Sequence, residues 1–189
     1  MKSLASCFKK HITRSILATV QRIAIVGTES TGKSTLAREL SQRFATVFVP
    51  EMARIYLEEI GSKWTYNDVL HIARLQLQKE DELLPFANKW LFCDTEMICI
   101  KVWLDFYKLP IPVWLTQQIE QRSYTHFLLM DIDLPWEPDT LRENELNRVQ
   151  LFNAFKVVLK QFNKPYTIIS GSETQRADSA AAVLNSLSC

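Results

Sequence analysis

The sequence predicts an α/β protein, a three-layer α/β/α sandwich built on a five-stranded parallel sheet. Five short apolar runs, rich in β-branched and aromatic residues, alternate with longer stretches of helical periodicity. Strands that alternate with helices in this way pair in parallel through right-handed crossovers. The expected strands are residues 22–26, 46–49, 90–93, 126–130 and 166–169.

Length and composition are those of a single domain with nearly balanced charge. The chain has 189 residues, of which 47% are hydrophobic, and a net charge of +1, which is enough for one core and gives no reason to expect a nucleic-acid partner. No apolar run approaches the roughly 18 residues of a membrane helix. The four cysteines are widely spaced, so we expect free thiols and a cytoplasmic protein.

We divide the chain into an N-terminal arm, residues 1–20, and a domain, residues 21–189. The arm contains no acid and alternates basic with apolar residues. Such a pattern is found in targeting presequences and membrane-surface helices. We favour a short amphipathic arm that packs on the domain.

The first expected strand leads into a phosphate-binding loop. Residues 27–34 read Gly-Thr-Glu-Ser-Thr-Gly-Lys-Ser and are followed by a helical pattern with Leu36 and Leu40 on one face. Strand, loop and helix are the context in which backbone N–H groups converge on phosphate oxygens. Lys33 is expected to contact the β- and γ-phosphates, and Ser34 to coordinate Mg²⁺. The predicted nucleotide-binding residues are Gly27, Thr28, Glu29, Ser30, Thr31, Gly32, Lys33, Ser34, Thr35 and, after the fifth strand, Gly171.

Local signals place the remaining helices. Residues 52–60 form a helix that ends at Gly61, and a longer helix begins near Thr65, where Asp68 completes a capping box. Further helices are expected over residues 95–107, 113–121, 145–162 and 173–187.

Acidic residues follow three of the strands, at the edge of a parallel sheet where ligands collect. Asp94 ends an apolar strand and is our first choice as the second Mg²⁺ ligand, with Asp131 as the alternative. Glu51 follows the second strand and precedes Arg54 by one helical turn. Glu51 is expected to accept a hydroxyl proton and Arg54 to orient the acceptor, although a helix-start acid paired with a surface arginine gives the same pattern.

Residues 131–144 break the helical pattern with two prolines and many charges, which indicates a mobile connection in the position of a lid. Its Arg142, and Arg148 beyond it, are candidates to cover the γ-phosphate when the lid closes. The aromatic residues available for ring stacking are Tyr56, Trp64, Trp103, Trp114 and Trp136. His71 and His126 have no partner at metal-ligand spacing, so we expect structural roles for them.

Four segments together resemble the nicotinamide riboside kinase domain of NadR-type proteins, within the AAA_28-like P-loop NTPases. They are the phosphate loop, Pro50-Glu51-Met52-Ala53-Arg54, Cys93-Asp94-Thr95-Glu96 and Trp136-Glu137-Pro138-Asp139-Thr140-Leu141-Arg142. The resemblance extends from about Arg22 to Leu187. It implies a P-loop kinase fold with a lid, and transfer of phosphate from ATP, with Mg²⁺, to the 5′-hydroxyl of nicotinamide riboside. The implied catalytic residues are Lys33, Glu51, Asp94 and Arg142, and the implied substrate-binding residues are Glu51, Arg54, Asp94 and Glu96.

Three positions depart from the family pattern. Pro50 stands where an aromatic residue often precedes the acid, so ring stacking must come from elsewhere; Thr140 replaces a glycine of the lid; Glu96 replaces an aspartate. The second, adenylyltransferase domain of the full-length bacterial proteins is not expected, since about twenty residues precede the first strand and no His-x-Gly-His type motif occurs.

Two other functions fit the same motifs. One is a kinase for a different nucleoside or small molecule, because the pocket is weakly encoded in the sequence. The other is an ATP-dependent switch that acts through a partner, although a switch needs neither the acid at Glu51 nor the arginine-bearing lid. The sequence leaves the oligomeric state open.

Overall fold

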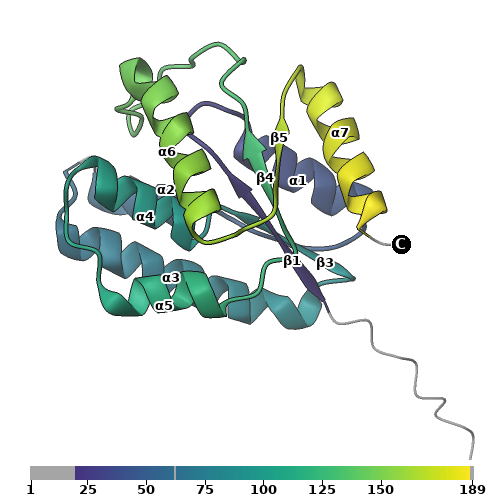
Figure 1. Ribbon diagram of the computed structural model, residues 1–189, viewed down its shortest axis with the longest axis horizontal. Coiled ribbons are helices and arrows are strands. Elements are labelled where there is room, and N and C mark those ends of the chain that lie inside the picture. The colour runs from purple at the N-terminus through teal and green to yellow at the C-terminus, as the bar shows by residue number, and fades with distance from the viewer. Residues whose placement is uncertain (1–19, 62, 188–189) are drawn as a thin grey trace, which may run out of the picture.

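Five parallel strands form one sheet in the order β2-β3-β1-β4-β5 (Figure 1). The structure is a computed structural model that describes residues 20–61 and 63–187. The strands are β1 (Gln21–Val26), β2 (Phe48–Val49), β3 (Trp90–Asp94), β4 (His126–Met130) and β5 (Tyr166–Ile169). The predicted five-stranded parallel sheet is confirmed.

Helices cover both faces of this sheet. They are α1 (Lys33–Arg43), α2 (Met52–Ile60), α3 (Tyr66–Leu83), α4 (Met97–Phe106), α5 (Val113–Gln121), α6 (Arg148–Gln161) and α7 (Glu173–Ser186), with the short 3-10 helices η1 (Leu84–Phe86) and η2 (Glu145–Asn147). Within residues 20–61 and 63–187, none of the helices is both long and apolar enough to span a membrane.

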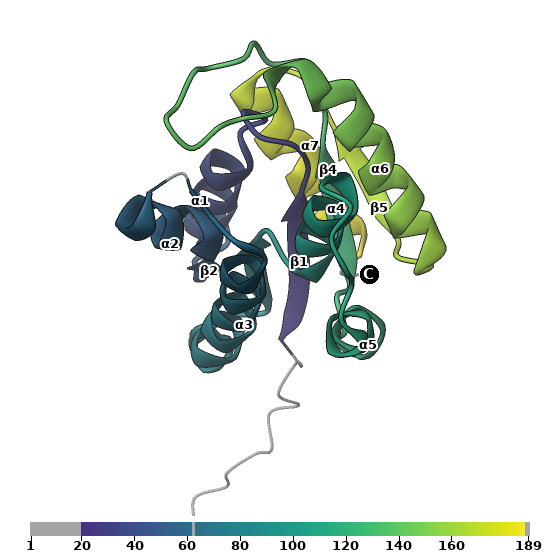
Figure 2. The same cartoon turned by 90° about the vertical axis from the view of Figure 1, so that its left-hand side faces the viewer.

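The two cores follow from the alternation of side chains along β1. Ile23 and Ile25 pack in one core with buried residues of α1 and α7, whereas Ala24 and Val26 pack in the other with residues of α2 to α6. Figure 2 shows α3, α4 and α5 on the side of the sheet away from α7. The three-layer sandwich predicted from the strand and helix pattern is therefore confirmed.

Capping residues set the helix boundaries near the loops. Thr65 and Asp68 form the predicted capping box of α3, and Gly61 follows α2 with φ +86°. The predicted helix over residues 95–107 begins at Met97 instead, because Thr95 has φ +69° and Glu96 is extended. A carboxyl oxygen of Glu96 accepts the N–H of Ile98 at 2.8 Å, which makes Glu96 the N-cap of α4.

The second strand is shorter than the predicted residues 46–49. Thr46 reaches the end of the neighbouring strand through its side chain, since its hydroxyl donates to the carbonyl of Trp90 at 2.7 Å and accepts the N–H of Asn88 at 2.8 Å. These side-chain bonds take the place of ladder pairing at this residue. The predicted arm of residues 1–20 falls, apart from Val20, outside the described residues.

Candidate active site

The phosphate loop, residues 27–34, joins β1 to α1 at the carboxyl edge of the sheet. Gly27 has φ +143°, and a Cβ there would lie 3.1 Å from the carbonyl oxygen of Met130, so a side chain would push the loop off β4. Gly32 caps α1 in the left-handed region, with φ +77°. The Nζ of Lys33 donates to the carbonyl of Thr28 at 2.8 Å. The loop therefore curls around its own lysine at the start of a helix, where anions bind.

Asp94 lies beside this loop at the end of β3. The register pairs it with Ile25 of β1, and its carboxylate lies beside the Ser34 side chain. Its Oδ1 is buried and has no hydrogen-bond partner among the described residues. Burial, with the negative charge of Glu51 nearby, raises the pKa of Asp94 to about 7. A buried carboxylate that lacks a partner next to a hydroxyl is a donor set that suits a divalent cation.

Glu51 stands at the start of α2 without serving as a side-chain cap of that helix, so its carboxylate is available to the cavity. The buried side chain of Gln76, on α3, holds this end of α2 against β3. Its Oε1 accepts the N–H of Met52 at 3.0 Å, and its Nε2 donates to the carbonyl of Thr95 at 3.3 Å. Gln76 thereby brings the two acids, Glu51 and Asp94, together across two strands.

The lid, residues 131–144, lies over the phosphate loop (Figure 1). The Glu29 carboxylate accepts the backbone N–H groups of Glu143 at 3.1 Å and Asn144 at 3.0 Å. The Ser30 hydroxyl accepts the N–H of Glu137 at 2.9 Å. Side chains of the phosphate loop thus hold the backbone of the lid in place.

Arginines complete the contacts of the lid. Arg142 bonds to the Ser30 hydroxyl at 3.4 Å and to the carbonyl of Glu137. Arg54 pairs with Asp139 of the lid at 2.8 Å, as well as with Glu58 on its own helix at 3.0 Å. Arg54 therefore ties α2 to the lid.

One cavity of about 410 Å³ extends from the phosphate loop to an apolar end. Its polar side includes the whole phosphate loop with Thr35, and also Glu51, Arg54 and Arg142. Its apolar side comes from α2, α4, α6 and the loop before α3, with Leu57, Trp64, Cys99, Val102, Trp103, Phe106, Tyr107, Leu151 and Phe155. The volume is in the range of small-molecule sites.

We call Trp64, Trp103 and Tyr107 the aromatic wall. The ring of Trp64 meets Trp103 edge-on at 5.0 Å between centroids and Tyr107 edge-on at 4.8 Å. The Tyr107 hydroxyl donates to the carboxylate of Glu143 in the lid at 3.1 Å. The aromatic end of the cavity is therefore linked directly to the lid, and through Glu143 to Glu29 of the phosphate loop.

Most of the predicted site residues border this cavity, but three do not line it. Asp94 lies just beneath the phosphate loop, beside Ser34. Glu96 is buried and turned to Ile98, and burial raises its pKa to about 8. Gly171 lies behind the loop and donates its N–H to Asp133 at 2.6 Å. Arg148 also bonds behind the loop, to the carbonyl of Ser30 at 3.1 Å.

The remaining candidates fall outside the cavity. Of the five aromatic candidates, Tyr56 packs on His71, Arg74 lies over Trp114 and Arg148 lies over Trp136. His126 bonds to the Thr167 hydroxyl at 2.9 Å. No cluster of metal-binding side chains of three or more members occurs among residues 20–61 and 63–187.

Sequence reasoning assigned no role in the site to Gln76, Tyr107 or Glu143. Tyr107 is the residue that follows α4, and only the packing of α4 under the lid reveals its position. The aromatic spacing of Trp103 and Tyr107, one turn apart on a helix, was the available signal.

Comparison with known proteins gives concordant matches. The profile of the family described as AAA domain matches residues 22–176. The chain is 28% identical over 152 residues to the trifunctional NAD biosynthesis/regulator protein NadR of Escherichia coli (strain K12), covering 76% of this chain and 37% of that protein. It is 29% identical over 150 residues to NadR of Salmonella typhimurium (strain LT2), with the same coverage. The chain thus spans little more than a third of the curated relatives it matches.

Solved structures show the same fold. The crystal structure of NadR protein in complex with NR superposes with a TM-score of 0.77 at 21% identity, covering 90% of this chain and 50% of that one. Deoxyadenosine kinase from M. mycoides, with products bound, gives a TM-score of 0.60 at 15% identity, covering 88% of this chain and 100% of that one. With a family match over most of its length, a glycine-rich loop at the end of β1 and a kinase-type sheet order, this chain belongs to the AAA domain family and has the P-loop kinase fold.

Proposed function

We propose that this protein is a kinase that transfers the γ-phosphate of ATP to the 5′-hydroxyl of nicotinamide riboside, giving nicotinamide mononucleotide. The observation that carries the proposal is the single cavity that joins a phosphate loop to an aromatic wall, with Glu51 on its lining. Two observations support the choice of acceptor: the sequence similarity to NadR proteins, and the fold shared with a NadR protein solved in complex with NR.

The phosphate end fits MgATP. Lys33 and the backbone amides of the loop would hold the phosphates, and Ser34 with Asp94 would hold Mg²⁺, directly or through water. The orphaned Oδ1 of Asp94 is the atom that gains a partner in this arrangement. Bound Mg²⁺ would neutralise charge on the transferring phosphoryl group.

The acceptor hydroxyl requires a group that takes its proton. Glu51 lines the cavity and acts on Asp94 electrostatically, so it lies near the metal-binding end. With Asp94 committed to Mg²⁺, Glu51 is the acid left to accept the proton or orient the hydroxyl. Arg142, which borders the cavity from the lid, would add positive charge at the phosphoryl group.

The aromatic wall suits the nicotinamide ring. Nicotinamide riboside carries a flat, positively charged pyridinium ring, which aromatic faces attract both by stacking and by the cation–π effect. Trp64 and Trp103 come from the loop before α3 and from α4, so the ring would be held without the aromatic residue that Pro50 replaces. The aromatic wall would thus provide the ring stacking that Pro50 cannot.

The proposal is tested with a panel of nucleosides. Purified protein is incubated with MgATP and nicotinamide riboside, adenosine, thymidine or uridine, and the products are identified by mass spectrometry. We expect nicotinamide mononucleotide as the main product. Transfer to thymidine or adenosine with none to the riboside would show that the protein is a different nucleoside kinase. A rate of ADP production that is the same with and without each acceptor would indicate a nucleotide-dependent switch.

A further inference from the structure

Arg176 is a buried arginine whose side chain reaches the back of the phosphate loop. It lies on α7 and is 2% exposed. Its Nη1 donates to the carbonyl of Thr31 at 2.8 Å, and its Nε to the carbonyl of Gly171 at 2.8 Å. Its Nη2 donates to the carbonyl of Asp131 at 3.2 Å and pairs with the Asp133 carboxylate.

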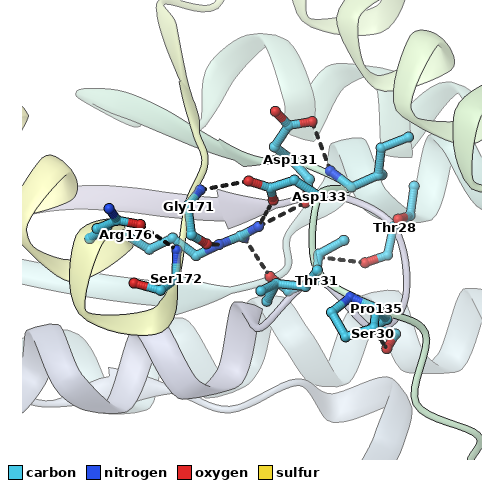
Figure 3. A network of polar contacts seen from close by, with 12 residues as sticks. Thr28, Ser30, Thr31, Asp131, Asp133, Pro135, Gly171, Ser172 and Arg176 are labelled. Atoms are coloured by element: carbon cyan, nitrogen blue, oxygen red, sulfur yellow. Dashed lines mark hydrogen bonds and ion pairs between the residues drawn. The ribbon is translucent and has the colours of Figure 1, made fainter.

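These contacts join three segments that are far apart in the sequence. Figure 3 shows the guanidinium between Thr31 of the phosphate loop, Asp133 at the root of the lid and Gly171 in the turn after β5. Asp133 also links Arg176 to the turn after β5, because its second carboxylate oxygen accepts the N–H of Gly171 at 2.6 Å. One side chain therefore fixes the loops that follow β1, β4 and β5.

The bond to Thr31 sets the direction of a backbone amide. The carbonyl of Thr31 and the N–H of Gly32 belong to one planar peptide unit, in which the two groups point in opposite directions when the bond is trans. The described residues contain no cis peptide. By holding the carbonyl toward α7, Arg176 directs the Gly32 N–H away from α7.

Arg176 does not itself serve as a phosphate ligand. It is absent from the cavity lining, whereas Thr31 and Gly32 are part of it. All three of its guanidinium nitrogens already donate to protein oxygens. Its influence on a bound nucleotide must therefore pass through the backbone that it holds.

We infer that Arg176 is a positioning residue for nucleotide binding, which presets the phosphate loop through Thr31 and ties it to the root of the lid through Asp133. An amide fixed before the ligand arrives does not have to be ordered on binding, so its loss weakens affinity for phosphate groups. The inference rests on the nucleotide binding proposed above, and not on the identity of the acceptor.

The test measures the binding of MgADP by calorimetry in Arg176→Lys, Arg176→Met and Asp133→Asn. We expect the Kd for MgADP to rise about tenfold or more in the Arg176 variants, and to rise less in Asp133→Asn, because asparagine still accepts a hydrogen bond. The KM for ATP should rise in parallel, while the KM for the riboside stays within about twofold of the original. Arg176→Met leaves buried carbonyls without a donor and is therefore the variant least able to fold. If it does not fold, the Kd values of Arg176→Lys and Asp133→Asn test the inference.

Arg43→Met is the matched control. Arg43 pairs with Asp178 of the same helix α7 at 2.7 Å, but on the surface and away from the loop. We expect its Kd for MgADP to remain unchanged. A purely structural role for Arg176 would lower the melting temperature and leave the Kd of the folded variants at its original value, and that result would overturn the inference. Because MgADP binding needs no acceptor, failure of transfer to the riboside would count against the proposed acceptor alone.

Discussion

The Ser34 side chain lies beside the carboxylate of Asp94, although the two residues lie sixty positions apart in the chain. Ser34 belongs to the first turn of α1 and Asp94 ends β3. Parallel pairing of β1 with β3 brings them to the same edge of the sheet. The proposed Mg²⁺ site is thus a product of sheet topology.

Replacing Glu51 by glutamine should slow turnover about a hundredfold or more, because glutamine cannot take the proton of the acceptor hydroxyl. The KM for ATP should change little, since the phosphate loop is untouched. Steady-state kinetics with both substrates varied will separate the two constants. If Glu51→Gln keeps the original kcat, Asp94 and not Glu51 accepts the proton.

Replacing Trp103 by leucine should raise the KM for nicotinamide riboside about tenfold, because the ring loses an aromatic face while the site keeps most of its apolar volume. The KM for ATP should stay as it was. Trp114→Leu is the control, since Trp114 lies beside Arg74 away from the cavity. Equal effects of the two substitutions on the riboside KM would argue against the aromatic wall.

Replacing Arg142 by methionine should lower kcat about a hundredfold, because a positive charge at the phosphoryl group is lost. Arg142 also holds the lid to Ser30, so release of the lid should let water reach the phosphate. We therefore expect the ratio of ATP hydrolysis to transfer to rise. Measuring ADP and nicotinamide mononucleotide in the same reaction gives this ratio, and a proportional fall in both products would contradict the role of the lid.

Glu96 provides a prediction about stability. Burial raises its pKa from near 4.5 to about 8, so the folded chain keeps this proton over a range in which the unfolded chain releases it. The free energy of unfolding therefore falls as the pH rises from about 4.5 to about 8, through this group. Glu96→Gln removes that contribution and keeps an oxygen for the N–H of Ile98.

The variant should gain stability relative to the original protein as the pH rises through this window, by more than about 1 kcal/mol in total. Urea unfolding at pH 5 and pH 8.5 measures the difference. Glu120→Gln, at an exposed position of α5, is the control. A difference between Glu96→Gln and the original protein that is the same at both pH values would show that Glu96 is ionised in the folded state.

The strands, the phosphate loop and most of the cavity residues on the loop side were predictable because they depend on local patterns. An apolar β-branched run, the glycines of the loop and the capping box at Thr65 each act within a few residues. Parallel pairing of the strands followed from the alternation of strands and helices, whereas the strand order came only from the structure. Local signals were therefore enough for the phosphate end of the site.

The rest depends on packing between distant segments. The sequence of α3 contains several polar residues, among them Gln76, and only the structure shows that Gln76 is buried between α2 and β3. Glu96 followed Asp94 in a motif that resembles a binding pair, but the left-handed conformation of Thr95 turns it into the cap of α4. Arg176 carried no sequence signal at all, because its partners are mainly backbone carbonyls of other loops.

The most direct test of phosphoryl transfer at this cavity follows the γ-phosphate of labelled ATP. The protein is incubated with [γ-³²P]ATP, Mg²⁺ and nicotinamide riboside, with Asp94→Asn as the inactive control. We predict that the label appears in nicotinamide mononucleotide and that its transfer depends on the riboside. Label recovered only as inorganic phosphate, at a rate that is the same with and without the riboside, would contradict the account.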